Sequence, residues 1–296
     1  MEGRRFSRRA VLRGLGVVAA VVVGTGVGRV VRRPGRVPRP AGARVVRRAY
    51  GSGPLQFGDL RVPDSAGPHA VALVVHGGFW LPGYDLDLMD PLCDALTAAG
   101  IATWNVEYRR IGEGGGYPDT FLDAAAGADL LATLATEFAL DLARVVSVGH
   151  SAGGHLALWL AARPRISSGQ LRPVRPPLVP RAALSLAGIA DLALASSLGL
   201  GAVDRLMGGT PAQVPERYVS GSPAELLPLG VPQLLLHGRD DTIVPLQIAE
   251  GYHDAAVARS DRATLTVLDR IGHFELVDPA SAAWPAVRDG VRSLLG

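Results

Sequence analysis

The stretch Val145-Val146-Ser147-Val148-Gly149-His150-Ser151-Ala152-Gly153-Gly154 decides the fold of this chain. It begins as an apolar run typical of a buried strand, and a helical pattern of leucine and alanine follows at residues 156–162. A serine on such a sharp turn from strand to helix takes a strained backbone conformation, which only small neighbours such as Gly149 and Gly153 tolerate. The turn raises the Ser151 hydroxyl above the edge of the sheet, so we predict that Ser151 is a nucleophile.

A second glycine-containing loop follows an earlier apolar run. Residues 70–75 indicate a buried parallel strand, and His76-Gly77-Gly78-Phe79-Trp80 comes directly after it. Glycines at this place let backbone amides approach a ligand closely. We therefore expect N–H groups of Gly78 and Phe79 to join that of Ala152 in binding an oxyanion, and the sequence leaves open which of the first two points inward. The His76 ring is expected to bond to the loop backbone rather than to act as a base.

An acid and a histidine occur in the chain order that a Ser-Asp-His set requires. A strand-like apolar run precedes a loop that contains Asp240 and Asp241, and the acid of such a set belongs on a loop after a strand. His273 follows the strand-like residues 263–268. We predict that His273 takes the proton of Ser151, while an aspartate fixes the tautomer of the ring and stabilises the imidazolium.

These motifs resemble those of a known superfamily. From about residue 69 to the C-terminus the chain resembles the α/β-hydrolases, and HGGFW, GHSAGG, HGRDDTIVP and GHF are similar to motifs of the esterase and kynurenine-formamidase-like branch. The resemblance implies an α/β fold with a mostly parallel central sheet, helices on both faces and a small cap. Its pattern H-G-x-x-D-x-x-V-P selects Asp241 over Asp240 as the acid. The chain departs from the hormone-sensitive-lipase pattern at Phe79 and His150, which disfavours a lipase for bulky esters.

The remaining sequence supports one catalytic domain over residues 49–296, because alternating strand and helix patterns suit a single α/β core. We expect strands near 56–62, 70–76, 101–107, 144–149, 181–187, 232–237 and 263–268, and helices near 86–99, 119–139, 151–163, 246–259 and 280–295. Residues 163–180 are rich in proline and arginine and are expected to form an exposed connection. For residues 192–228 two interpretations remain: a small cap that narrows the acyl pocket, or a plain connection of helix and loop.

Residues 1–48 are predicted to direct the protein out of the cytoplasm. Ser7-Arg8-Arg9-Ala10-Val11-Leu12-Arg13 resembles the twin-arginine export consensus of bacteria, and an uncharged apolar segment follows at residues 14–28. That segment is shorter than the roughly 20 residues that span a membrane comfortably. Because no clean small-x-small cleavage site follows it, a cleaved leader and an uncleaved membrane anchor both remain open. The alternative is a basic, disordered tail on a cytoplasmic protein.

Charge is divided unevenly between the two parts of the chain. Residues 1–48 carry 13 arginines and one acid, a net charge of +12, so the remainder carries −9 of the total of +3. An acidic catalytic domain argues against nucleic-acid binding and fits a small neutral or cationic substrate. Cys93 is the only cysteine, which excludes an internal disulfide, and we expect it to be buried. The chain has no metal-binding motif, and the predicted chemistry needs no cofactor.

Together these features predict a serine hydrolase that cleaves carboxylic esters of small to medium acyl chains through an acyl-enzyme. Two alternatives use the same residues: an aryl-formamidase of the kynurenine type, which the HGGFW loop favours and export disfavours, and an exported peptidase or amidase. A hydrolase-fold binding protein without activity is a further alternative, against which the complete set Ser151, Asp241 and His273 argues. The sequence leaves acyl length, leaving group and oligomeric state open.

Overall fold

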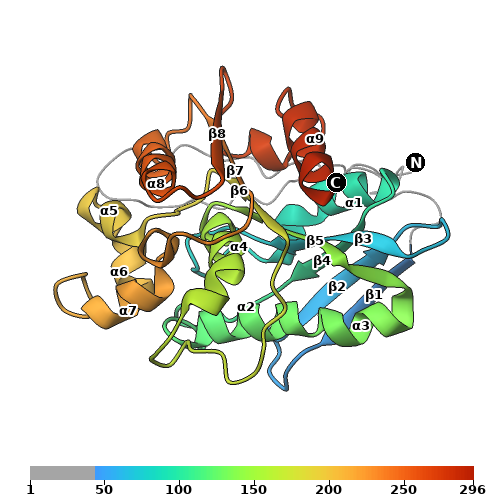
Figure 1. Ribbon diagram of the computed structural model, residues 1–296, viewed down its shortest axis with the longest axis horizontal. Helices are drawn as coiled ribbons and strands as arrows, with labels where there is room; N and C mark the ends of the chain where they lie inside the picture. Colours follow the sequence, from blue (N-terminus) through green and yellow to red (C-terminus); the bar gives the residue numbers. More distant parts are fainter. Residues whose placement is uncertain (1–43) are drawn as a thin grey trace, which may run out of the picture. The chain divides into compact units, whose positions relative to one another are not determined.

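The computed structural model describes residues 44–296, which form an eight-stranded sheet with helices on both of its faces (Figure 1). The strands lie in the spatial order β1-β2-β4-β3-β5-β6-β7-β8. They are β1 (Arg44–Ala49), β2 (Phe57–Val62), β3 (His69–Val75), β4 (Ala102–Val106), β5 (Leu140–His150), β6 (Ala182–Leu186), β7 (Gln233–Gly238) and β8 (Ala263–Leu268). The β1–β2 and β2–β4 pairs are antiparallel and all other pairs are parallel. The predicted fold class, a mostly parallel sheet between helices, is thus confirmed.

The helices divide between the two faces of the sheet. They are α1 (Asp90–Ala98), α2 (Asp119–Asp129), α3 (Leu131–Phe138), α4 (Ala152–Ala162), α5 (Leu192–Ser197), α6 (Gly201–Met207), α7 (Pro215–Gly221), α8 (Leu246–Ala258) and α9 (Trp284–Leu295). Helices α1 and α9 lie on one side, and α2 and α3 lie on the other (Figure 1). Side chains of β3 alternate between the two cores, because Val71 and Leu73 belong to one and Ala72 and Val74 to the other.

All seven expected strands are present, and the expected helices differ only in detail. The helix predicted at 119–139 is divided at Leu130 into α2 and α3. The helix predicted at 86–99 starts as a 3-10 turn, Leu86–Met89, before α1. Cys93 lies in α1 and is fully buried, as predicted.

The predicted boundary between residues 48 and 49 is wrong, because it falls inside the edge strand β1. The arginines of β1 suggested a linker, whereas charged side chains are common on edge strands, where they discourage pairing with other chains. Arg47 donates from Nε and Nη2 to Asp59 of β2 at 2.7 and 2.8 Å, and its guanidinium lies 4.1 Å from the centre of the Phe57 ring. The domain therefore begins no later than Arg44. The rest of the predicted leader lies outside the described residues.

Residues 192–228 form three short helices, α5 to α7, and a 3-10 turn, Pro223–Leu226. The segment is bonded to α4: Trp159 Nε1 donates to the Ser220 carbonyl at 3.0 Å, and His155 Nε2 donates to the Gly221 carbonyl at 2.8 Å. Its backbone is therefore fixed to the helix that follows Ser151. Whether the segment narrows an acyl pocket stays a prediction.

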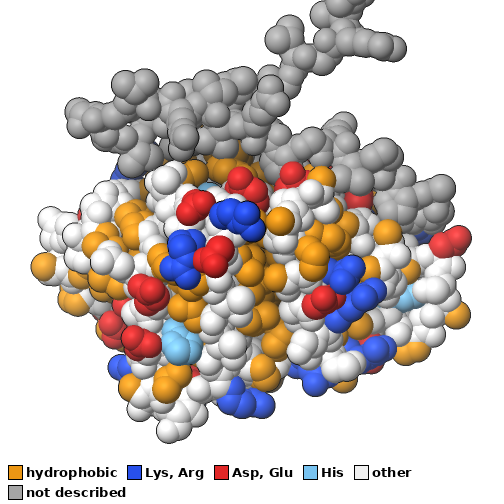
Figure 2. Space-filling model, turned by 90° about the horizontal axis from the view of Figure 1, so that it is seen from above, with side chains coloured by type: hydrophobic (Ala, Val, Ile, Leu, Met, Phe, Trp, Pro, Cys, Tyr) orange, Lys and Arg blue, Asp and Glu red, His pale blue; other side chains and the backbone are white. Residues whose placement is uncertain are grey.

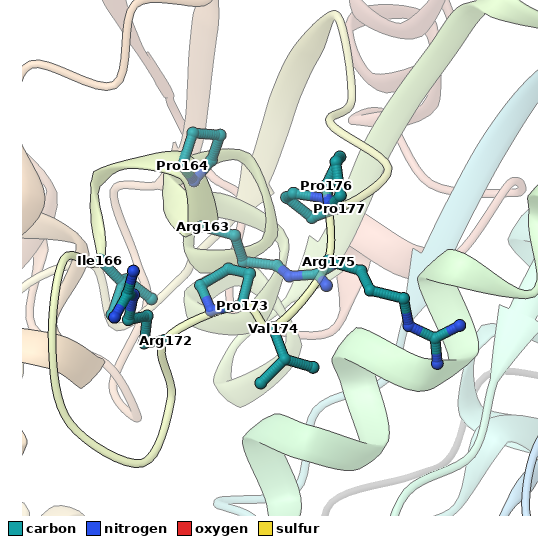
Figure 3. A pocket seen from close by; sticks show the side chains of 9 residues that line it. All are labelled: Arg163, Pro164, Ile166, Arg172, Pro173, Val174, Arg175, Pro176 and Pro177. Atoms are coloured by element: carbon teal, nitrogen blue, oxygen red, sulfur yellow. The ribbon is translucent and has the colours of Figure 1, made fainter.

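The arginine- and proline-rich connection at 163–180 contains one 3-10 turn, Arg163–Arg165, and is otherwise irregular. Val174 is 95% exposed, in agreement with the expected exposed connection. Prolines and arginines of this segment line a surface cavity of about 360 Å³ (Figure 3). The cavity is lined by neither Ser151 nor His273, so it is separate from the predicted site.

On the face shown in Figure 2, arginine and acidic side chains lie close together in several places. Another contact between opposite charges is buried: Arg61 of β2 has a side chain only 1% exposed and donates from Nε to Asp94 of α1 at 2.8 Å, and from Nη2 to Asp90. The pair ties α1 to the antiparallel end of the sheet. A buried charge is tolerated because its partners compensate the lost hydration.

We predict that Arg61→Met lowers the free energy of unfolding by about 3 kcal/mol, because it leaves two carboxylates without their cation. The matched control is Arg288→Met, which removes an exposed pair with Asp289 and should leave the free energy of unfolding nearly unchanged. Urea unfolding of the three proteins measures both values. Equal effects of the two substitutions would contradict the structural role assigned to Arg61.

Candidate active site

Ser151 stands between the end of β5 and the start of α4. Its backbone has φ 58° and ψ −120°, the positive-φ conformation expected for a sharp turn from strand to helix. The Ser151 N–H donates to the Leu186 carbonyl of β6 at 2.8 Å, which fixes the turn against the neighbouring strand. The residue itself is only 2% exposed.

The glycines around Ser151 are required by close backbone packing. A Cβ at Gly149 would lie 1.9 Å from the Gly153 carbonyl oxygen, and one at Gly153 would lie 2.1 Å from the Val75 carbonyl oxygen. Both distances are far below any van der Waals contact, and both involve backbone atoms that cannot move aside. The packing of α4 onto the ends of β3 and β5 therefore depends on these glycines.

Asp241 and His273 meet on adjacent loops after β7 and β8. His273 Nδ1 donates to Asp241 Oδ2 at 2.6 Å, and the two side chains are 3% and 1% exposed. Asp240, its neighbour in sequence, is exposed and bonds through its backbone N–H to the Ile271 carbonyl at 2.9 Å. Of the two candidate acids, the one that contacts the histidine is Asp241.

The surroundings of Asp241 keep its carboxylate ionised. Burial by itself would raise the pKa of Asp241, but the hydrogen bond and positive charge of His273 oppose it, as do amide N–H groups. Asp241 Oδ1 accepts from the Ile243 and Val244 amides at 2.8 and 3.0 Å. The net result is a pKa of Asp241 below its ordinary value.

His237, to which the sequence assigned no role, lies beside the same carboxylate. Its Nε2 bonds to the Val244 carbonyl at 3.0 Å and lies 3.5 Å from Asp241 Oδ2. Burial lowers the pKa of His237, so the ring adds no full charge next to the acid at neutral pH. The only feature of the sequence that could have indicated this contact is the spacing of four residues between His237 and Asp241 in HGRDD.

The loop after β3, which the sequence predicts to bind an oxyanion, contains three successive residues with positive φ. Gly78, Phe79 and Trp80 have φ of 113°, 54° and 55°. Gly78 tolerates no side chain, because a Cβ there would lie 2.7 Å from the Tyr84 Cβ. Within residues 44–296, the N–H groups of Gly78, Phe79 and Ala152 donate to no other protein atom. All three predicted amides are therefore available to a ligand.

The His76 ring bonds to the backbone of this loop and to the side chain of Glu107. Its Nδ1 lies 2.8 Å from the Gly77 carbonyl oxygen and its Nε2 lies 3.0 Å from Glu107 Oε1. Burial would raise the pKa of Glu107, but the charge and hydrogen bond of His76, the charge of Arg110 and the Tyr108 amide lower it overall. His76 is thus structural, as predicted.

Two further histidines flank the serine and are buried. His150 Nε2 donates to the His273 carbonyl at 2.9 Å, and the two rings have their centres 4.4 Å apart. His155, one turn into α4, bonds instead to residue 221. Burial lowers the pKa of His150 to about 3, with a smaller contribution from the charge of His273, and lowers that of His155 to about 4. His150 thus brings the base loop beside Ser151.

No helix within the described part of the chain is long and apolar enough to cross a membrane. The same residues contain no group of three or more histidine, cysteine or acidic side chains that could hold a metal ion.

With this geometry in place, the chain can be compared with known proteins. The BD-FAE family model matches residues 59–255, more than half of the chain, so the chain belongs to this family. It is 25% identical over 232 residues to a probable carboxylic ester hydrolase, LipM, of Mycobacterium tuberculosis, a match covering 76% of this chain and 54% of the relative. It is 33% identical over 115 residues, 38% of this chain and 24% of the relative, to a probable isoprenylcysteine alpha-carbonyl methylesterase of Arabidopsis thaliana. The matches thus span about half or less of these relatives.

Solved structures support the same fold. A truncated carbohydrate esterase from gut microbiota is similar with a TM-score of 0.75 and 17% identity, over 89% of this chain and 99% of that one. A thermophilic esterase of Thermogutta terrifontis with propionate bound has a TM-score of 0.68 and 21% identity, over 86% and 94% of the two chains. These likenesses identify the α/β-hydrolase fold.

We predict that Asp241→Asn lowers ester hydrolysis by about 10³- to 10⁴-fold, because the amide no longer holds the His273 ring in its tautomer or stabilises its charge. Asp240→Asn is the matched control and should stay within about threefold of the unaltered protein, since its side chain is exposed. Steady-state kinetics with a p-nitrophenyl ester compare the two. A larger loss in the Asp240 variant would mean that the acid is misassigned.

The buried histidines also predict how stability depends on pH. In the unfolded chain the His155 ring takes up a proton as the pH falls through about 6.5, whereas the folded ring does so only near its pKa of about 4. The stability is therefore present above pH 6.5 and lost between pH 6.5 and 4. His155→Gln keeps a donor for Gly221 but cannot take up a proton.

Between pH 7 and pH 5 the His155→Gln variant should thus lose about 2 kcal/mol less unfolding free energy than the unaltered protein. Urea unfolding at the two pH values tests this, and an identical loss in both proteins would contradict a buried, neutral His155.

Proposed function

We propose that the protein is a serine hydrolase that cleaves carboxylic esters, with Ser151 as nucleophile, His273 as base and Asp241 as the acid that orients the base. The observation that carries the proposal is the 2.6 Å bond between Asp241 and His273, on a loop that is bonded to His150, the residue preceding Ser151. Membership of the BD-FAE family and the likeness to carboxylic ester hydrolases support it.

In the first half of the reaction the Ser151 hydroxyl oxygen attacks the carbonyl carbon of the ester. His273 Nε2 takes the hydroxyl proton and then gives it to the departing alcohol as the C–O bond breaks. The Asp241 carboxylate remains ionised, since its pKa is lowered, and it stabilises the imidazolium that forms. The product of this half is an acyl group bound to the serine oxygen.

The second half repeats the proton transfers with water in place of serine. His273 takes a proton from water, whose oxygen attacks the acyl carbon, and then returns a proton to the Ser151 oxygen as the carboxylic acid leaves. In both halves the negative charge on the tetrahedral carbon's oxygen lies at the N–H groups of Gly78, Phe79 and Ala152. Prearranged amides of this kind each contribute about 3 kcal/mol to lowering the barrier.

The substrates we propose are esters of small to medium acyl chains. A structural neighbour that has propionate bound supports this size. The departure of this loop from the hormone-sensitive-lipase pattern at Phe79 disfavours bulky esters. Formamides and amides share the same chemistry, so N-formylkynurenine belongs in the substrate panel beside the esters.

We further propose that the enzyme works outside the cytoplasm, delivered by the twin-arginine-like leader. The support is the sequence of residues 7–13 and the apolar segment that follows it. Detection of the protein in cell fractions with and without an active twin-arginine pathway tests this location.

We predict that Ser151→Ala lowers kcat for p-nitrophenyl propionate by about 10⁶-fold, since the nucleophile is lost, while the free energy of unfolding changes by less than about 1 kcal/mol. Kinetics and urea unfolding of the same preparation measure both. A Ser151→Ala protein with undiminished turnover would refute the serine mechanism. A folded, unaltered protein that cleaves no ester, formamide or amide of the panel would favour a binding protein.

A further inference from the structure

We propose that His150 is a positioning residue for the base: its ring clamps the loop of His273 to the turn of Ser151 and thereby sets the distance between base and nucleophile. The inference rests on the proposed function, because it gives His150 a task only if His273 and Ser151 act together. His150 would touch no reacting atom. It acts through His273, to which its ring is directly bonded.

Three contacts hold the base loop on His150. The His150 Nε2 donates to the His273 carbonyl oxygen at 2.9 Å. The two rings pack with centres 4.4 Å apart and planes at 51°, and the Phe274 ring lies 5.6 Å from His150. The chain separation of His150 and His273 is 123 residues, so this bond joins two distant parts of the fold.

The other end of the clamp is rigid. His150 is the last residue of β5 and pairs with Leu186 of β6, and the next residue is the positive-φ Ser151. A shift of the His150 ring would therefore require a shift of the sheet or of the strained turn. Because small changes in the geometry of reacting groups cost large factors in rate, such a rigid link has a direct effect on turnover.

The anion-binding loop meets the same side chain. A Cβ added at Gly77 would lie 2.7 Å from the His150 carbonyl oxygen and 3.0 Å from His150 Nδ1. Gly77 therefore packs directly on this ring, and the nucleophile turn, the base loop and the anion-binding loop converge on one residue.

The protonation state of His150 suits this task. A bond to a carbonyl oxygen requires a hydrogen on Nε2, and the ring is fully neutral at physiological pH because burial lowers its pKa to about 3. A neutral donor holds the carbonyl without placing a second positive charge against the imidazolium of His273. An acidic side chain at this position would have no hydrogen to donate.

His155 provides a matched control. It is also completely buried, its Nε2 also donates to a backbone carbonyl, and its pKa is also lowered by burial. Its partner is Gly221 of α7, however, and not the base loop. Loss of His155 removes a similar bond from the fold without touching the pair of Asp241 and His273.

The test is a double-mutant cycle on kcat/KM with a p-nitrophenyl ester. It compares the unaltered protein, His150→Met, Asp241→Asn and the double variant. Because His150 acts by aiming a ring that Asp241 also aims, we expect His150→Met to cost roughly 30-fold alone but at most about threefold in the Asp241→Asn background. The loss should fall on kcat rather than on KM.

Two further variants separate positioning from stability. His155→Met, combined with Asp241→Asn, should change kcat/KM by the same factor in both backgrounds, since it lies outside the clamp. His150→Gln keeps a neutral N–H donor and should stay within about threefold of the unaltered protein. If His150→Met fails to fold, the folded His150→Gln variant decides: retained activity supports the clamp, and a 30-fold loss overturns it.

The inference is overturned if His150→Met costs less than threefold, or if it costs the same factor with and without Asp241. These results differ from failure of the proposed function. That failure would appear as an unaltered protein without esterase activity, or as an Asp241→Asn variant as active as the unaltered one. In either case His150 would have no base to position.

Discussion

The strained backbone turn at Ser151 sets how α4 and the ends of β3, β5 and β6 pack together. A non-glycine residue at φ 58° is costly, and it persists because both sides of the turn are fixed. The Ser151 amide is bonded to β6, and the glycines at 149 and 153 let α4 pack on the ends of β3 and β5 with no room for a Cβ. That packing buries α4 completely and places its first amides at the edge of the sheet.

Near this turn a buried, ionised acid lies among histidines that burial keeps neutral. Asp241 is buried yet ionised, because His273 and two backbone amides outweigh its desolvation. His150, His155 and His237 lie close by, and burial lowers the pKa of each, so they serve as neutral hydrogen-bonding groups. Asp241 is thus an ionised acid in direct contact with His273.

The sequence predicted the central strands and the loops that carry Ser151, Asp241 and His273. It did so because continuous apolar runs and glycine motifs indicate local conformation directly. The pairing of Asp241 with His273 followed from chain order and a motif. Strand β1 was missed, since its three arginines resemble a linker until Asp59 and Phe57 are seen beside Arg47. The parts played by His150 and His237 were also missed, because a histidine's role depends on its partners, and the partner of His150 is 123 residues away.

Labelling of the folded domain with a fluorophosphonate, followed by peptide mapping, shows whether Ser151 is the activated nucleophile. Such a reagent phosphonylates a serine that a neighbouring base activates, with loss of fluoride, and its product resembles the tetrahedral intermediate at the anion-binding amides. We expect a single label on Ser151, formed rapidly in the native protein and absent after unfolding. A native protein that takes up no label, or takes it up on another residue, would contradict it.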